Sequence, residues 1–348
     1  MQRFKKRKLT YREYIRIRFK ESFWDGILGF IGLLFIASRI YSAVKYGPSM
    51  GDTIIHIAMF LLIVLIFLIY FSIAFLKTRE LDLEDFIKDM KISGKEGFPI
   101  IPLGTLENGE KIFFNMQENP HIKVVGQTGS GKSNFLHNII LSLISCHSPS
   151  EVKLVLSDEK RVEFSEYKSL PHILSKVLEN TDSEANAIKW LVWEMNRRYE
   201  ILEENKKRTI VEYNKGAQEK MPFIFYIIDE LVDLLKSKKR REISQNMVSL
   251  LQKGRAVGIF IIAASSYTGF VMHSSLVAVN FACSSVGFRM NSKTDAHRFL
   301  LEGAEKLPVG EALCCIYNLK KPVRVRIPIS SDSLKRKIIS EALDEHLS

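Results

Sequence analysis

One segment of the sequence combines the residue types that bind a phosphate chain. Residues 126–133 read GQTGSGKS and fit the pattern G-x-x-x-x-G-K-[ST]. Glycines let backbone N–H groups turn toward phosphate oxygens, Lys132 can reach the β- and γ-phosphates, and Ser133 can ligate Mg²⁺. The sequence therefore predicts ATP and Mg²⁺ as cofactors. The residues expected to contact the nucleotide are Gly126, Gln127, Thr128, Gly129, Ser130, Gly131, Lys132, Ser133 and Asn134.

A second segment supplies two adjacent carboxylates. Residues 223–230 read FIFYIIDE, an apolar run that ends in Asp229 and Glu230. Beside a phosphate loop, an aspartate at a strand end can support Mg²⁺, and a following glutamate can polarise the attacking water. Taken alone, such a strand end is usually structural, but its pairing with the loop favours catalysis. We therefore expect Lys132, Asp229 and Glu230 to be catalytic, with Ser133 and Asp229 at the metal.

Both motifs need a scaffold, and the sequence alternates between strand-like and helix-like runs. Buried apolar strands separated by helices predict an α/β fold with a mostly parallel sheet that is covered on both faces. Trp190 and Trp193 are expected on the apolar face of one of these helices. The strand-like runs are 101–104, 111–116, 122–125, 152–156, 223–228, 259–264, 285–289 and 323–329. The helix-like runs are 81–90, a stretch from 132, 185–204 and 245–253.

Two apolar runs precede the α/β region. Residues 27–44 are apolar except at Ser38, Arg39 and Ser42, and residues 54–76 form a cleaner run. Because a bilayer requires about 20 apolar residues, residues 27–76 are expected to form two transmembrane helices. A cleaved signal peptide is the alternative for the first run, but no good small-residue cleavage site follows it.

The net charge of +11 is concentrated at the N-terminus. Residues 1–20 hold nine Lys and Arg against the single acid Glu13, whereas residues 80–348 hold 37 bases and 35 acids. Positive charge before a first span places that end in the cytoplasm, and two spans return the chain there. The basic pI therefore does not indicate DNA binding. We expect a protein of the cell membrane with its α/β domain in the cytoplasm.

Between about residues 101 and 312 the sequence holds a series of short motifs, which include SDEK at 157–160, LPHIL at 170–174, EMNRRY at 194–199, RAVGI at 255–259 and GAEKL at 303–307. In this order they resemble the FtsK/SpoIIIE family of DNA-pumping motors. The resemblance implies a RecA-like P-loop NTPase that works as a hexameric ring around duplex DNA. The expected organisation is a basic cytoplasmic tail at 1–26, a two-helix anchor at 27–76, a linker at 77–99 and an FtsK-like motor domain at 100–348.

The resemblance also implies two sites that spacing alone does not indicate. Arg255 lies where the family places an arginine that reaches a neighbouring subunit's nucleotide, and a structural salt bridge is the alternative. Lys293, His297 and Arg298 fall in or beside a segment that resembles a DNA-facing pore loop, and a solvated surface loop is the alternative. The basic run 236–241 could add phosphate contacts, although solvated charge is the more common role.

The sequence departs from the family directly after the run 259–264. Where the family typically reads A-T-Q-R-P, residues 264–268 read ASSYT. The glutamine that would sense the γ-phosphate is therefore Ser266, and the basic pore residue that follows is Tyr267. The sequence also leaves no C-terminal stretch for the family's winged-helix module, which reads oriented DNA sequences.

These features favour a membrane-anchored, ATP-driven DNA translocase that acts as a coupling protein for a conjugative transfer channel. Expected partners are DNA, the membrane, further subunits of a homo-hexamer, a relaxase and channel proteins. A compact chromosome or plasmid partitioning motor and a protein-secretion ATPase of the same superfamily are alternatives. A docking protein that binds nucleotide without productive hydrolysis is a third alternative. The sequence indicates neither the direction of translocation nor a preference for single- or double-stranded DNA.

Overall fold

The computed structural model describes residues 82–92, 97–266, 276–281, 284–317, 319 and 321–347, together with the isolated positions 41, 45, 62 and 65. Apart from those isolated positions, the expected anchor at 27–76 lies outside the described residues. Within the described ranges, no helix combines the length and apolar character needed to cross a bilayer. The nucleotide motifs and the expected DNA-contact residues all lie in one compact unit, Leu81–Ser348.

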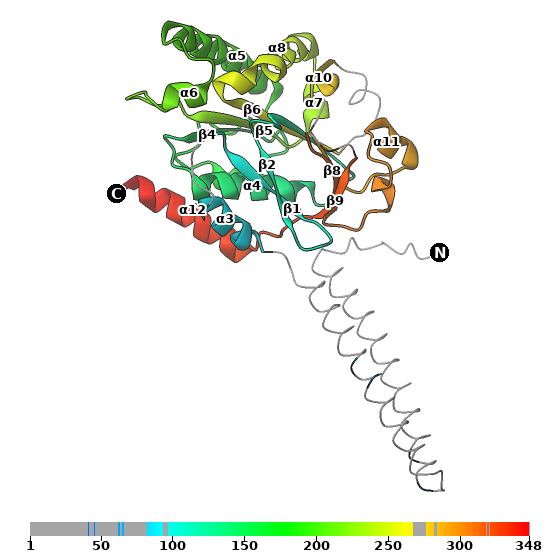
Figure 1. Cartoon of the computed structure of the whole chain (residues 1–348). Coiled ribbons are helices and arrows are strands. Elements are labelled where there is room, and N and C mark those ends of the chain that lie inside the picture. The colour runs from blue at the N-terminus through cyan, green and yellow to red at the C-terminus, as the bar shows by residue number, and fades with distance from the viewer. Residues whose placement is uncertain are drawn as a thin grey trace. The chain divides into compact units, whose positions relative to one another are not determined.

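The described residues of this unit contain a nine-stranded sheet in the order β2-β1-β9-β8-β7-β3-β6-β5-β4 (Figure 1). Strands β7, β3, β6, β5 and β4 run parallel, whereas β8, β9, β1 and β2 join by antiparallel pairing. The parallel core confirms the predicted α/β class, and the antiparallel extension makes the sheet mixed. The strands are β1 (Ile100–Thr105), β2 (Lys111–Asn115), β3 (His121–Val125), β4 (Val152–Ser157), β5 (Phe223–Ile228), β6 (Ile259–Ser265), β7 (Ser285–Gly287), β8 (Glu311–Cys315) and β9 (Val323–Arg326).

Helices cover both faces of this sheet (Figure 1). One apolar cluster packs α3, α4 and α12 against the sheet, and a second packs α5, α7 and α8 against the other face. The helices are α3 (Leu83–Ile92), α4 (Lys132–Cys146), α5 (Thr181–Glu204), α6 (Ile210–Asn214), α7 (Leu231–Lys236), α8 (Arg240–Lys253), α10 (Leu276–Asn280), α11 (Lys293–Arg298) and α12 (Asp332–Leu347). Short 3₁₀ turns are η1 (Ser165–Tyr167), η2 (Gly254–Val257) and η3 (Ala304–Lys306).

Helix α5 shows which residues of a long amphipathic helix enter the core. Ile188, Leu191 and Met195 follow helical spacing and are buried against the sheet and α8. Trp190 and Trp193 fall outside this stripe and are 38% and 57% exposed. The expectation that both tryptophans lie on the apolar face is therefore wrong.

The strand order brings the two sequence motifs to one edge of the sheet. Strand β6 lies between β3 and β5, with Val125 paired to Ser265 and Ile228 paired to Ala263. Because the three strands are parallel, their carboxyl ends meet at the same edge. The phosphate loop, the carboxylate pair and the end of β6 consequently form one site.

Candidate nucleotide-binding site

The phosphate loop joins β3 to α4, as the motif predicted. Gly131 caps α4 with φ 118°, a left-handed conformation that glycine adopts without steric cost. A Cβ atom at Gly126 would lie 2.7 Å from Phe288 Cβ. The first N–H groups of α4 have no partner within the helix, and the helix dipole favours an anion at this end. The loop is therefore shaped to receive a phosphate group.

Lys132 is held inside this loop. Its Nζ donates to the carbonyl oxygens of Gly126 at 2.7 Å and Gln127 at 3.1 Å. Burial lowers the pKa of Lys132 to about 8, while the charges of Glu230 and Asp229 act in the opposite direction. A phosphate oxygen would offer this partly desolvated ammonium group a stronger partner than two neutral carbonyls.

The donor atoms around the loop fit a nucleotide with its magnesium ion. Ser130 Oγ is fully buried and has no hydrogen-bond partner among the described residues, so it is available to a bound phosphate. Ser133 and Asp229 offer the hydroxyl and carboxylate oxygens that Mg²⁺ prefers. Among the described residues, no group of three or more His, Cys, Asp or Glu could hold a metal ion.

Asp229 and Glu230 stand at the end of β5, where the sequence placed them. Burial raises the pKa of Asp229 to about 6, and the nearby charge of Glu163 adds to this shift. Glu230 Oε1 accepts a hydrogen bond from Ser265 Oγ at 2.7 Å, and Glu230 Oε2 accepts one from the Ser266 N–H at 2.9 Å. The end of β6 thus fixes the carboxylate assigned to water activation.

A third carboxylate, which was not predicted from the sequence, reaches the site from the loop after β4. Hydrogen bonding from His137 is the main cause that holds the pKa of Glu163 below its usual range, and Ser133 contributes in the same direction. His137 Nε2 lies 3.5 Å from Glu163 Oε2. The buried Asp158 shapes this loop because its Oδ2 accepts the Glu163 N–H at 2.8 Å. The family-like SDEK motif was the available signal, since it begins this loop.

Asn134 has a different environment from the other expected nucleotide contacts. Its Nδ2 donates to the Pro328 carbonyl at 2.9 Å, and Asn138 Nδ2 donates to the same oxygen at 2.7 Å. The amide of Asn134 thus ties α4 to the segment before α12.

Arg255 lies far from the phosphate loop of its own chain. It is exposed in η2, just before β6, whereas Ser265 at the opposite end of that strand contacts Glu230. A strand advances about 3.3 Å per residue, so β6 separates the two positions by roughly 20 Å. Among the described residues no ion pair involves Arg255, which gives no support to a structural salt bridge. Any contact with a nucleotide would require a neighbouring copy.

The three expected DNA contacts are gathered on α11. Lys293, His297 and Arg298 are all exposed. His297 Nδ1 lies 3.0 Å from Glu302 Oε1, and Arg298 Nη1 lies 3.5 Å from Asp295 Oδ1. Since α11 follows β7, which runs parallel to β3, this cluster lies beyond the same sheet edge as the phosphate loop. The basic run 236–241 lies elsewhere, from the last residue of α7 to the first turn of α8, where Lys239 pairs with Asp182 at 2.7 Å.

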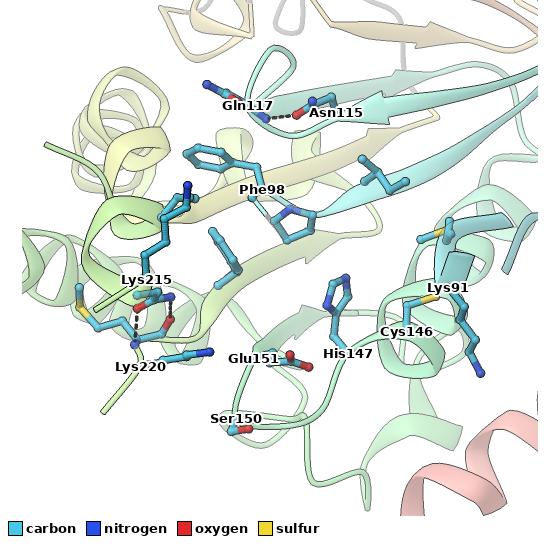
Figure 2. A pocket seen from close by; sticks show the side chains of 18 residues that line it. Lys91, Phe98, Asn115, Gln117, Cys146, His147, Ser150, Glu151, Lys215 and Lys220 are labelled. Atoms are coloured by element: carbon cyan, nitrogen blue, oxygen red, sulfur yellow. Dashed lines mark hydrogen bonds between the residues drawn. The ribbon is translucent and has the colours of Figure 1, made fainter. Parts of the chain in front are cut away.

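A separate cleft of about 670 Å³ opens at the opposite edge of the sheet. Figure 2 shows Lys91 on one side of this cleft and Lys215 and Lys220 on the other. Phe223, the first residue of β5, also lines it. None of the expected nucleotide contacts does, so this cleft is distinct from the nucleotide site.

Comparison with known proteins gives consistent matches. The FtsK/SpoIIIE family model matches residues 82–269. The chain is 36% identical over 244 residues to DNA translocase FtsK of Chlamydia pneumoniae, and the aligned region covers 66% of this chain and 30% of that protein. It is 33% identical over 258 residues to DNA translocase SpoIIIE of Bacillus subtilis, and this aligned region covers 71% of this chain and 32% of that protein. The chain thus spans about a third of the length of these curated relatives.

Solved structures share the fold. The conjugation coupling protein TcpA of pCW3, determined with ATPγS, matches with a TM-score of 0.62 and 24% identity over 71% of each chain. The cytoplasmic domain of the type VII secretion ATPase EccC of Thermomonospora curvata matches with a TM-score of 0.61 and 23% identity. That match covers 72% of this chain and 31% of the other. At these identities the likeness establishes an α/β P-loop NTPase fold.

Proposed function

The chain belongs to the FtsK/SpoIIIE family, and from that premise we propose that its domain at 100–348 hydrolyses ATP to move DNA. The arrangement of Lys132, Asp229 and Glu230 at one sheet edge carries this proposal. Lys132 follows β3, whereas Asp229 and Glu230 follow β5, and Ser265 and Ser266 hold Glu230 in place. A domain that only bound nucleotide would not need an oriented carboxylate there.

Each residue has a defined task in this scheme. The loop N–H groups and Lys132 bind phosphate oxygens, and Ser133 and Asp229 would hold Mg²⁺. Glu230 orients the attacking water and accepts its proton. ATP bound with Mg²⁺ supplies the phosphoryl group that is transferred and a cation that neutralises its oxygens. The half-buried Asp229 must be ionised for this purpose, so a cation beside it would oppose the effect of partial burial on its pKa.

The wider assembly is part of the proposal. A RecA-like homo-hexameric ring would place the exposed Arg255 of one subunit at the nucleotide of the next. Lys293, His297 and Arg298 would then face DNA in the pore through phosphate contacts. Because residues 80–348 hold only two more bases than acids, DNA must be bound by such a local patch rather than by a global field.

We further propose that two transmembrane helices within 27–76 anchor this motor to the cell membrane with both ends in the cytoplasm. The nine basic residues in the first twenty support this topology. Cysteine-accessibility labelling of the full chain should find the turn at 45–53 outside and Ser348 inside. Labelling of Ser348 from outside would contradict the proposal.

For the biological process, we propose coupling of DNA, with a bound relaxase, to a conjugative transfer channel. The fold likeness to TcpA supports this choice. The likeness to EccC supports a second candidate, a protein-secretion ATPase. A partitioning motor would share the enzymology and differ in the replicon that it serves.

A salt titration of DNA binding, with assays of DNA-stimulated ATP hydrolysis, separates a DNA motor from a secretion ATPase and from a docking protein. We expect duplex DNA to stimulate ATP hydrolysis by the full chain, and its binding to weaken steeply with salt. The slope of the logarithm of the DNA-binding constant against the logarithm of the salt concentration should become shallower in Lys293→Ala, by about one unit for each lysine–phosphate pair removed. The same substitution should abolish the stimulation of ATP hydrolysis by DNA. Lys189→Ala, at an exposed lysine on α5, is the matched control.

Three other outcomes would contradict the proposal. If Lys293→Ala retains the full slope and stimulation, DNA does not pass α11. If a signal peptide stimulates hydrolysis and DNA does not, the protein is a secretion ATPase. If ATP is bound without turnover under all conditions, the protein is a docking factor.

A further inference from the structure

The side chain of Gln127 connects the phosphate loop to the segment before α11. In the amide orientation that pairs donors with acceptors, Gln127 Oε1 accepts from Arg289 Nε at 2.6 Å and Nη2 at 3.1 Å. Its Nε2 donates to Asn291 Oδ1 at 2.7 Å. The Gln127 backbone N–H also donates to the Arg289 carbonyl at 2.8 Å. One loop residue thus makes four hydrogen bonds to a segment more than 160 positions away in the sequence.

The backbone carbonyl of Gln127 also contacts Lys132, the lysine assigned to phosphate binding. Lys132 Nζ donates to the Gln127 carbonyl at 3.1 Å. A bound phosphate would compete for that ammonium group, so the hydrogen bond from Lys132 to the Gln127 carbonyl depends on whether nucleotide is present. A change in nucleotide occupancy therefore acts directly on the residue that holds Arg289 and Asn291.

The other end of the connection lies at the expected DNA contacts. Asn291 directly precedes Ser292, whose Oγ accepts the Asp295 N–H at 3.1 Å and caps α11. Lys293 is the first residue of that helix. On the other side of Asn291, the Met290 N–H donates to the Ala304 carbonyl at 3.2 Å, which fixes the segment to η3. A shift at Gln127 is therefore passed on to α11 within a few residues.

The end of β6 has a different task in this chain. The family's γ-phosphate-sensing glutamine corresponds to Ser266, whose backbone N–H is bound to Glu230. The serine side chain is too short to replace a glutamine in that role. Communication between the nucleotide and DNA would therefore need another path, and β7 on the opposite side of β3 offers one.

We propose that Gln127, Arg289 and Asn291 are positioning residues that couple nucleotide occupancy to the grip of α11 on DNA. This inference rests on the proposed DNA contacts at α11. In thermodynamic terms, the connection makes the affinities for nucleotide and for DNA depend on each other, by the same factor in both directions.

Two substitutions each remove part of the connection without changing a residue of the phosphate loop. Arg289→Met keeps the aliphatic stem and removes the guanidinium group, and Asn291→Ala removes an amide at an exposed position. Arg324→Met is the matched control, since Arg324 is a half-exposed arginine of β9 that pairs with Glu311. For each full-length protein, the affinity for a fluorescent duplex of random sequence is measured with and without ATPγS. Basal and DNA-stimulated ATP hydrolysis are measured in parallel.

In the unmodified protein and in Arg324→Met, ATPγS should change the DNA affinity by a factor within about 5–150, the usual range of allosteric coupling. In Arg289→Met this factor should fall toward one, and in Asn291→Ala it should fall by less, because these changes remove two and one of the four hydrogen bonds, respectively. Basal hydrolysis should persist in both variants while DNA stimulation decreases. Adding Gln127→Ala to Arg289→Met also removes the bond to Asn291, and the combined decrease in coupling should be smaller than the sum of the two separate decreases.

Two results would overturn the inference, and they can be told apart. If Asn291→Ala and Arg289→Met keep the full coupling factor while DNA still stimulates the unmodified protein, the connection has no coupling role and the proposed function stands. If DNA neither binds nor stimulates the unmodified protein, the proposed function fails and the inference fails with it. Should Arg289→Met not fold, the exposed Asn291→Ala decides alone.

Discussion

Replacing Glu184 by glutamine should flatten the pH dependence of the stability of this domain. Glu184 lies in the first turn of α5, is 1% exposed, and accepts a hydrogen bond from Ser157 Oγ at the end of β4. Its Oε2 is buried without a partner among the described residues. Burial is the main cause that raises the pKa of Glu184 to about 7, and the charges of Glu159 and Asp233 act in the same direction.

The size of the effect follows from this pKa. A glutamate in the unfolded chain has a pKa of about 4.3. Between that value and about 7, the folded state binds more protons than the unfolded state, so stability falls as the pH rises through this window. Integrating from pH 5 to pH 8 gives a decrease of about 2–3 kcal/mol from this one group. Above pH 8 the decrease is complete, and below about pH 4 it is absent.

Glutamine is neutral at every pH, so the Glu184→Gln protein should lack this decrease. Its amide resembles the protonated carboxyl group, although a buried N–H without a partner costs about 1–3 kcal/mol at all pH values. The comparison is therefore the change in unfolding free energy between pH 5 and pH 8, and not the stability at one pH. Urea unfolding can be followed by the fluorescence of Trp190 and Trp193, which lie on the same helix.

The control is Glu200→Gln, at an exposed position of α5. It should keep the pH dependence of the unmodified protein. If Glu184→Gln shows that same dependence as well, burial does not raise the pKa of Glu184. The electrostatic account of this helix would then be wrong.

The nucleotide site carries further predictions. Lys132→Ala should abolish tight binding of a fluorescent ATP analogue, because a phosphate loses its charged partner, and unchanged affinity would refute this. Glu230→Gln should still bind ATP but turn over about 10²–10⁴-fold more slowly in single-turnover assays; normal turnover would remove the role assigned to Glu230. Arg255→Ala subunits mixed with Lys132→Ala subunits should recover part of the activity, because one interface then pairs an intact loop with an intact arginine. No recovery at any ratio would place Arg255 within a single subunit.

The sequence was sufficient for the parts of the site that are locally encoded. The loop before Lys132 needs glycines for its backbone conformation, and β5 needs an apolar run that ends in Asp229 and Glu230. Each pattern lies within one element, so spacing alone predicted both. The parallel order of β3 and β5 then brought them together, as alternating strands and helices had indicated.

Contacts between distant segments were not predictable in the same way. Glu163 is one of three glutamates within eight residues, and only the fold shows that it approaches Ser133 and His137. Helix α12 was not predicted either. It packs on α4, and its residue Lys335 pairs with Glu166 of η1 at 2.7 Å. Trp190 and Trp193 were misplaced because composition shows that a helix is amphipathic but does not fix which positions join the buried stripe.

The two neighbours of β3 have separable tasks, and this separation can be tested at Ser265. On one side, Ser265 Oγ at the end of β6 donates to Glu230, so Ser265→Ala should weaken the orientation of the catalytic carboxylate. A hydrogen bond to a charged group contributes about 1.5–3 kcal/mol, so the turnover rate should fall by roughly 10- to 100-fold. On the other side, Arg289 follows β7 and holds Gln127. Ser265→Ala should therefore slow hydrolysis without changing the effect of ATPγS on DNA affinity, whereas Arg289→Met should do the reverse. If either substitution changes both quantities equally, the two sides of the loop act as one unit.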